Sequence, residues 1–353
     1  MSGAVLLQIV TATGLAATPL GKPIAICNQR GPTPPAQPVA GPGSTEYAHD
    51  LVLQSSFGER ERRFDLFEPA SPTPQSAPII VFLHGYGAVD YRTYGDWIGH
   101  LVRRGNTVIF PQYQDGYFTP AYQLTSSAAA AVRTALEVLE TPGHVPPESD
   151  SMVLIGHSAG ALIAANMAGR AAEQGLPFPA AVMLANPADT AFGFGQVYNS
   201  IYSPEVYARI PAQTLLLAVI GSDDRVAPDE TSGQVLAVAV NVPAESKTVL
   251  RIYSDYHGCP RLIASHLAAG GVEEPVERQT SRRNSLPEDG RESREPRASA
   301  LEFFGYWKWL DALTDTVRFD LHREYAFGDT HEQKFMGLWS DGVPVIPAEV
   351  VWP

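Results

Sequence analysis

The sequence contains few of the residues that mark metal-binding and disulfide-rich proteins. Only two of its 353 residues are cysteine, Cys27 and Cys259, and its nine histidines are scattered rather than spaced as pairs of ligands. We therefore expect no metal and no cofactor. The two cysteines could be buried thiols or could form a single disulfide in an exported protein, and the sequence leaves both alternatives open.

Positive charge is scarce as well. Lysine and arginine number 25 against 38 aspartates and glutamates, which gives a formal net charge of −13 at pH 7. Nucleic-acid binding depends on clustered lysine and arginine, so we expect no nucleic-acid partner. No apolar run is long enough for an integral membrane span. The hydrophobic content of 44% nevertheless supports a large core. We expect the protein to be a monomer.

The first 44 residues have the composition of a leader followed by a linker. Residues 2–21 carry no charged side chain, with an apolar centre at Val5–Val10 and small residues at Gly14–Ala17. This resembles a signal peptide without its basic leading region, so we predict a secreted or cell-envelope protein, with a cytoplasmic one as the alternative. The proline- and glycine-rich stretch from Gly31 to Gly43 predicts an extended linker, and the folded domain is expected from Thr45 onward.

Short apolar runs alternate with helical patterns through the body of the chain. Such a succession indicates a parallel sheet that is buried on both faces. Alternating residues at 50–55 and 63–68, with Gly58 between them, predict an antiparallel hairpin before it. The fold class is therefore α/β, a mostly parallel twisted sheet with an N-terminal hairpin and helices on both faces. The predicted parallel strands are Ile79–Leu83, Thr107–Phe110, Met152–Ile155, Ala180–Ala185, Thr214–Ile220 and Val249–Tyr253.

Helical spacing of apolar residues identifies the segments between the strands. Residues 94–102 and 126–140 predict two helices, and the capping box at 299–302 opens a helix near the C-terminus. Pro260 stands where a helix would start, which would place His266 inside that helix.

Three segments depart from this regular succession. Residues 186–211 lie between two strands and carry several aromatic side chains, so they predict a helical connection or a partial lid over an apolar pocket. Residues 272–297 mix seven acidic and six basic residues with almost no apolar content, which is typical of a disordered insertion. Residues 316–353 are expected to pack over the domain as a C-terminal extension, because their large apolar side chains need burial.

The most informative motif is Gly156-His157-Ser158-Ala159-Gly160. It follows the apolar run that ends at Ile155 and precedes an alanine-rich helical pattern, so the serine stands at a sharp turn between a strand and a helix. Glycines on both sides allow a turn tight enough to lift the serine oxygen above the sheet, with the N-terminus of the helix directed at it. This context indicates a nucleophile.

With this motif, the chain from Glu46 to Asp315 resembles the α/β-hydrolase superfamily. The parallel strands, the serine after the third of them, and the order serine, acid, histidine along the chain carry the resemblance. The run Phe82-Leu83-His84-Gly85-Tyr86 is similar to the dienelactone-hydrolase, chlorophyllase and polyester-hydrolase-like serine esterases. A catalytic serine requires a base to take its proton and a carboxylate to orient the base.

The superfamily pattern predicts the acid and the base at the ends of later strands. Asp224 follows the strand at 214–220 and is the predicted acid, with Asp223 and Asp189 as alternatives. His257 follows the strand at 249–253 and is the predicted base. His266 is its rival, disfavoured because it would lie within the helix expected from Pro260.

The resemblance also implies an oxyanion hole and a substrate pocket. The backbone N–H groups of Tyr86 and Ala159 are the predicted oxyanion donors. The Tyr86 ring is expected to contact the substrate, together with Phe192 and Phe194 of the aromatic connection. These apolar walls predict a small, neutral or apolar ester as substrate.

Together these features predict a serine hydrolase of carboxylic esters. Two alternatives remain open at this stage. The same residues could cleave amides or peptides, or the fold could be catalytically silent and serve as a binding protein.

Overall fold

The computed structural model describes residues 31–352, except for residues 116–118, 190–200, 228 and 271–297. The predicted leader at 2–21 and the charged insertion predicted at 272–297 therefore lie outside the described residues. So do Phe192 and Phe194.

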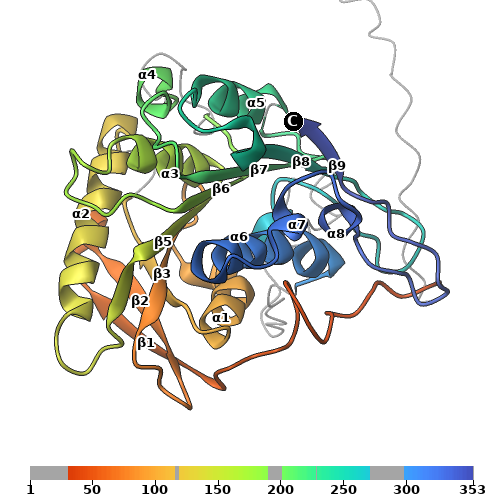
Figure 1. The fold of residues 1–353 in the computed structure, drawn as a ribbon, viewed down its shortest axis with the longest axis horizontal. Coiled ribbons are helices and arrows are strands. Elements are labelled where there is room, and N and C mark those ends of the chain that lie inside the picture. The colour runs from red at the N-terminus through yellow and green to blue at the C-terminus, as the bar shows by residue number, and fades with distance from the viewer. Residues whose placement is uncertain (1–30, 116–118, 190–200, 228, 271–297, 353) are drawn as a thin grey trace, which may run out of the picture.

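One nine-stranded sheet forms the centre of the described chain, in the order β1-β2-β4-β3-β5-β6-β7-β8-β9 (Figure 1). The strands from β3 to β8 are parallel, whereas β1 and β2 at one edge and β9 at the other pair antiparallel with their neighbours. The strand bounds are β1 Leu51–Phe57, β2 Phe64–Ala70, β3 Ala77–Leu83, β4 Thr107–Pro111, β5 Pro147–His157, β6 Ala181–Ala185, β7 Leu215–Gly221, β8 Lys247–Ile252 and β9 Glu349–Trp352.

Helices cover both faces of the sheet because the side chains of its strands alternate between two cores. In β3, Ile79 and Val81 belong to the core beneath α2, α3 and α5, whereas Ile80 and Phe82 belong to the core beneath α1 and α6. Figure 1 shows α1 and α6 side by side on their face of the sheet. The helix bounds are α1 Gly95–Arg103, α2 Ala121–Leu139, α3 Ala159–Gly169, α4 Pro204–Tyr207, α5 Asp229–Val238, α6 Trp307–Phe319, α7 Arg323–Ala326 and α8 His331–Lys334.

The α/β class, the N-terminal hairpin and all six predicted parallel strands are confirmed, with ends that differ by a few residues. The helix predicted over 126–140 begins earlier, at Ala121. The capping box forms in part, since the Glu302 carboxylate accepts a hydrogen bond from the Ser299 N–H at 2.5 Å. A single π-helical turn, Glu302–Tyr306, then leads into α6.

The residues predicted as a linker pack against the domain instead. Residues 42–44 are buried, and the Gly43 N–H donates to Asp311 Oδ2 at 2.7 Å. The Asp311 carboxylate is itself buried within α6 and contacts His100 and Arg104 of the α1 region. Proline and glycine composition predicted the extended backbone of this segment, but the hydrogen bonds of that backbone attach residues 31–44 to the domain.

The chain beyond α6 is fastened to that helix by a buried lysine. Lys308 Nζ donates to the backbone carbonyls of Glu332, Gln333 and Phe335 at 3.0, 3.0 and 2.7 Å. The indole N–H of Trp309 reaches the same Gln333 carbonyl at 3.0 Å. These two donors satisfy the carbonyls at the end of α8 and hold that end of the C-terminal segment against α6.

We predict that Lys308→Met destabilises the protein, because it leaves the part-buried Glu332 and Phe335 carbonyls without this donor while keeping the side-chain volume. The expected loss in the free energy of unfolding is on the order of 2–3 kcal/mol, measured by urea denaturation.

Lys334→Met is the matched control in the same segment. Lys334 pairs with Asp329 at 2.8 Å at the surface, and exposed pairs contribute less than about 1 kcal/mol. Equal losses from the two variants would show that the ammonium of Lys308 does not fasten the segment.

Candidate active site

Ser158 stands at the turn between β5 and α3 in a conformation that few side chains adopt. Its φ and ψ angles are 57° and −123°, and its N–H donates to the Ala185 carbonyl at 2.9 Å. A positive φ in a residue other than glycine is strained and requires support from its surroundings. The support comes from the flanking backbone, which packs too closely for side chains.

The two glycines of the motif are required by this packing. A β-carbon at Gly156 would lie 2.1 Å from the carbonyl oxygen of Gly160, and one at Gly160 would lie 2.2 Å from that of Leu83. The start of α3 therefore rests directly on the backbone at the end of β3. This contact explains why the pattern needs glycine at both positions.

A chain of hydrogen bonds connects Ser158 to a histidine and a carboxylate. His266 Nε2 lies 2.9 Å from Ser158 Oγ, and His266 Nδ1 lies 2.8 Å from Asp224 Oδ2. An ionised carboxylate only accepts, so Nδ1 carries the proton and Nε2 accepts from the serine hydroxyl. The arrangement can move a proton from the serine to the imidazole while the carboxylate faces the resulting positive charge.

Of the three predicted acids, Asp224 is the one that reaches this histidine. Its Oδ1 accepts from the N–H groups of Val226 and Ala227 at 2.8 and 2.9 Å. Asp223 instead accepts from the Tyr256 hydroxyl at 3.2 Å. The third candidate, Asp189, accepts from backbone N–H groups of the chain that follows it.

Asn186 and Tyr306 complete the environment of the carboxylate, and sequence reasoning missed both. Asn186 Nδ2 donates to Asp224 Oδ2 at 2.7 Å, and Asn186 Oδ1 accepts from the Tyr306 hydroxyl at 2.6 Å. Burial favours a raised pKa for Asp224, but the hydrogen bonds from His266, Ala227 and Asn186 outweigh it and hold the pKa below its ordinary value. The available signal for Asn186 was its position directly after a buried strand.

The prediction of His257 as the base is wrong in geometry. His257 Nε2 lies 2.8 Å from Asp341 Oδ2 of the C-terminal segment, and its ring packs edge-on against Trp339. Both members of this ion pair are more than a third exposed. The residue that meets Ser158 is His266, the alternative that the sequence disfavours because of the helix expected from Pro260.

The physical reason lies in the chain between β8 and His266. No helix starts at Pro260; residues 253–267 form a loop in which Asp255 and Leu262 pair through two backbone hydrogen bonds of 2.8 and 2.9 Å. This bridge closes an excursion, residues 255–262, that carries His257 away from the serine. The chain beyond the bridge returns to the end of the sheet and brings His266 to Ser158.

The loop after β3 lies against the serine. A β-carbon at Gly85 would lie 3.4 Å from Cβ of Ser158, so Tyr86, the next residue, is also close to the turn. Tyr86 is partly buried and packs against the core beneath α3. Ala159 is the first residue of α3, so its N–H lies at a helix N-terminus, a position that favours negative charge.

His84 in this loop is a supporting residue. Its ring stacks on Tyr113 with centroids 4.1 Å apart, and its Nδ1 donates to the Gly85 carbonyl at 2.7 Å. Burial lowers the pKa of His84 to about 4, although the Gly85 hydrogen bond opposes this. The side chain therefore stays neutral and fixes the loop.

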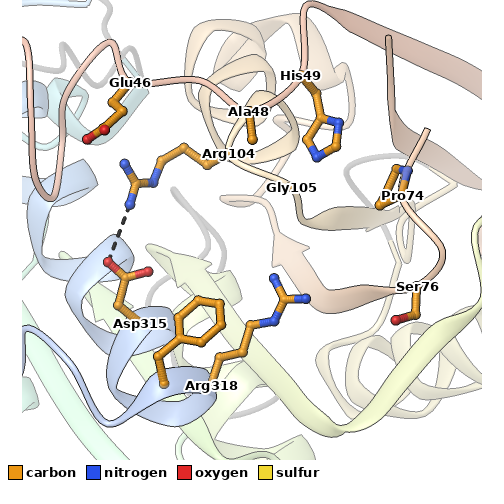
Figure 2. A pocket seen from close by; sticks show the side chains of 10 residues that line it. Glu46, Ala48, His49, Pro74, Ser76, Arg104, Gly105, Asp315 and Arg318 are labelled. Carbon is orange, nitrogen blue, oxygen red and sulfur yellow. Dashed lines mark hydrogen bonds and ion pairs between the residues drawn. The ribbon is translucent and has the colours of Figure 1, made fainter. Parts of the chain in front are cut away.

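A pocket of about 340 Å³ lies at the other end of the sheet and is separate from this site (Figure 2). It is lined by Ser76, which precedes β3, and by Arg104 and Asp315, which form an ion pair at 3.3 Å. Ser158 follows the opposite end of the parallel strands. Because of this separation, we assign the pocket no role in the chemistry of the serine.

The described residues contain no group of three or more histidine, cysteine or acidic side chains arranged to hold a metal. Within the same residues, no helix is both long and apolar enough to cross a membrane.

The structure has the α/β-hydrolase fold, which is defined by the strand order from β1 to β8, the serine turn after β5, and the aspartate and histidine after β7 and β8. A family model described as chlorophyllase matches residues 67–220, from β2 to β7. No curated protein matches the chain in sequence.

Similar solved structures include two fungal esterases. An esterase from Rhizomucor miehei is 17% identical with a TM-score of 0.46, over 65% of this chain and 80% of that chain. Carboxyl esterase 2 from Tuber melanosporum is 19% identical with a TM-score of 0.44, over 60% of this chain and 78% of that chain.

We predict that Gly160→Ala disrupts the site and the fold around it, because its β-carbon has no space beside the Leu83 carbonyl. The free energy of unfolding should fall by about 3 kcal/mol or more, measured by urea denaturation.

Gly99→Ala in α1 is the control, since a β-carbon there has no neighbour within 4 Å. Alanine in an open helical position should stabilise the protein by about 0.5–1 kcal/mol. A neutral Gly160→Ala would contradict the role of the close backbone approach.

Proposed function

We propose that the protein hydrolyses carboxylic esters through an acyl-enzyme on Ser158. His266 is the general base and Asp224 orients it. The observation that supports this most strongly is the continuous hydrogen bonding of Ser158, His266 and Asp224 at a strained strand-to-helix turn.

In the first half of the reaction, Ser158 Oγ attacks the acyl carbon while His266 Nε2 takes its proton. The imidazolium that forms is stabilised by Asp224, which accepts from Nδ1 and stays ionised. Collapse of the tetrahedral intermediate expels the alcohol, which receives the proton from His266. Water then attacks the acyl-enzyme with the same base, and the carboxylic acid leaves.

The negative oxygen of each tetrahedral intermediate requires donors that are already in place. The backbone N–H groups of Ala159 and Tyr86 serve this role in our proposal. The close packing of Gly85 against Ser158 and the start of α3 at Ala159 support it. Donors of this kind contribute about 10²–10³-fold to kcat in other hydrolases.

The substrate class that fits best is a small, neutral or apolar ester. Two apolar residues close to His266 in the chain are exposed: Ile263 by 38% and Leu267, the next residue, by 37%. The Tyr86 ring, in the loop that contacts the serine turn, is partly buried. The similarity of residues 67–220 to the chlorophyllase family model also favours an ester over an amide.

We predict that Ser158→Ala and His266→Ala each lower kcat for p-nitrophenyl esters by on the order of 10⁵–10⁶-fold, because the triad acts as a unit. His257→Ala is the matched control and should keep kcat within about twofold, since an exposed ion pair contributes little. Loss of activity in the His257 variant with retention in the His266 variant would overturn the assignment of the base.

Two further experiments distinguish an esterase from a silent binding protein and from an amidase. A fluorophosphonate probe should label the wild type and not Ser158→Ala, and an unlabelled wild type would indicate a silent binding protein. A p-nitroanilide with the same acyl group should be cleaved much more slowly than the ester.

We also propose that the protein is exported. Cys259 is disulfide-bonded, and disulfides persist mainly in oxidising compartments. Cys27, the only other cysteine of the chain, lies outside the described residues. We predict that alkylation of the unfolded, unreduced native protein modifies no thiol, as judged by its mass. Two alkylated cysteines would favour the cytoplasmic alternative.

A further inference from the structure

His266 stands in a loop without regular secondary structure, so its backbone needs support from elsewhere. That support comes from His157, the residue before the serine. His157 Nε2 lies 2.8 Å from the His266 carbonyl oxygen, and His157 Nδ1 lies 2.9 Å from the Tyr94 hydroxyl. The Tyr94 oxygen in turn accepts from the Gly85 N–H at 2.9 Å.

We propose that His157 and Tyr94 are positioning residues that hold the catalytic base and the oxyanion loop in one fixed geometry. This inference rests on the proposed function of Ser158 and His266. The chain of hydrogen bonds joins the loop after β3, the turn before α1, the end of β5 and the loop after β8. Neither side chain touches the substrate in this proposal; both act through the backbone of Gly85 and His266.

The direction of every hydrogen bond in the chain is determined. The Gly85 N–H can only donate, so the Tyr94 oxygen accepts there and its own proton goes to His157 Nδ1. His157 must then carry its proton on Nε2, where it donates to the His266 carbonyl. A proton on Nδ1 instead would displace the tyrosine proton and leave a buried hydroxyl without an acceptor.

Burial keeps both side chains of this hydrogen-bonded chain, Tyr94 and His157, in their neutral forms. Tyr94 and His157 are 1% and 4% exposed. Burial raises the pKa of the Tyr94 hydroxyl. It lowers the pKa of His157 to about 3, with the neighbouring His266 acting in the same direction and the hydrogen bond to the His266 carbonyl opposing it.

A neutral His157 also matters for the charge that develops in the reaction. The rings of His157 and His266 have centroids only 4.9 Å apart. When His266 takes the serine proton, a second cation at this distance would oppose its formation. The hydrogen bonds of His157 therefore hold the base in place without adding a positive charge that would oppose its protonation.

The test compares variants that break the chain with one that preserves it. Tyr94→Phe and His157→Leu remove its hydrogen bonds, and we expect kcat to fall by roughly 10- to 100-fold with KM little changed, because misplaced catalytic groups affect the transition state more than substrate binding. His157→Gln keeps one acceptor and one donor on a planar group and should retain kcat within roughly threefold.

A double-mutant cycle measures the coupling between the two substitutions in kcat, which a merely structural role of each residue would not produce. If Tyr94 and His157 act through one chain, the double variant Tyr94→Phe/His157→Leu loses no more kcat than the worse single variant. Independent effects would multiply instead, which would overturn the inference.

Asn106→Leu controls for general destabilisation. Asn106 is also buried and donates to a backbone carbonyl at 2.8 Å, that of Leu101, but it precedes β4 at the other end of the sheet. It should lower stability and leave kcat unchanged.

The outcomes also separate this inference from the proposed function. An active Ser158→Ala overturns the proposed function and this inference with it. An inactive Ser158→Ala with normal kcat in Tyr94→Phe and His157→Leu overturns the positioning role alone.

Discussion

The close backbone approach between α3 and the end of β3 is the contact on which the whole site depends. Because residue 160 has no side chain, the helix can rest on the Leu83 carbonyl, which fixes the turn that holds Ser158. The same approach brings Gly85 beside the serine. One glycine contact therefore sets the position of the nucleophile relative to the proposed oxyanion donors, and the hydrogen bonds of His157 extend that geometry to the base.

Buried charged side chains at the site and on α6 have several hydrogen-bond partners each. The Asp224 carboxylate accepts hydrogen bonds from a turn, an asparagine and the base, so it stays ionised despite its burial. Lys308 and Asp311 of α6 serve the two ends of the described chain in a similar way, one through carbonyls near α8 and the other through the Gly43 N–H. A buried charge without hydrogen-bond partners is costly, whereas one with its partners in place helps to specify a single arrangement of the core.

Sequence reasoning recovered the sheet because each strand is a short apolar run with helical spacing on either side. It also predicted Ser158 and Asp224, two members of the hydrogen-bonded chain, because both follow such runs directly. It did not predict the histidine that meets Ser158, because the excursion, residues 255–262, is closed by a backbone bridge that has no side-chain pattern. Asn186, Tyr306 and Tyr94 were missed for a related reason: each contacts the site through tertiary packing, and Tyr94 and Tyr306 are also ordinary core aromatics in the pattern. The segment 31–44 was misread because its attachment depends on backbone N–H and carbonyl groups.

The excursion has a consequence for how this site can vary. The pairing of Asp255 with Leu262 closes the excursion where the chain leaves and returns, so its exposed side chains can change while His266 keeps its place at the serine. Gly258 is an exception, because a β-carbon there would lie 2.2 Å from the Pro32 carbonyl oxygen. The tip stands at the surface, with Tyr256 more than half exposed, and it contacts both the Pro32 carbonyl and Trp339. The backbone bridge thereby separates the surface of this loop, where Tyr256 is exposed, from the position of His266, so the two parts of one loop can vary independently.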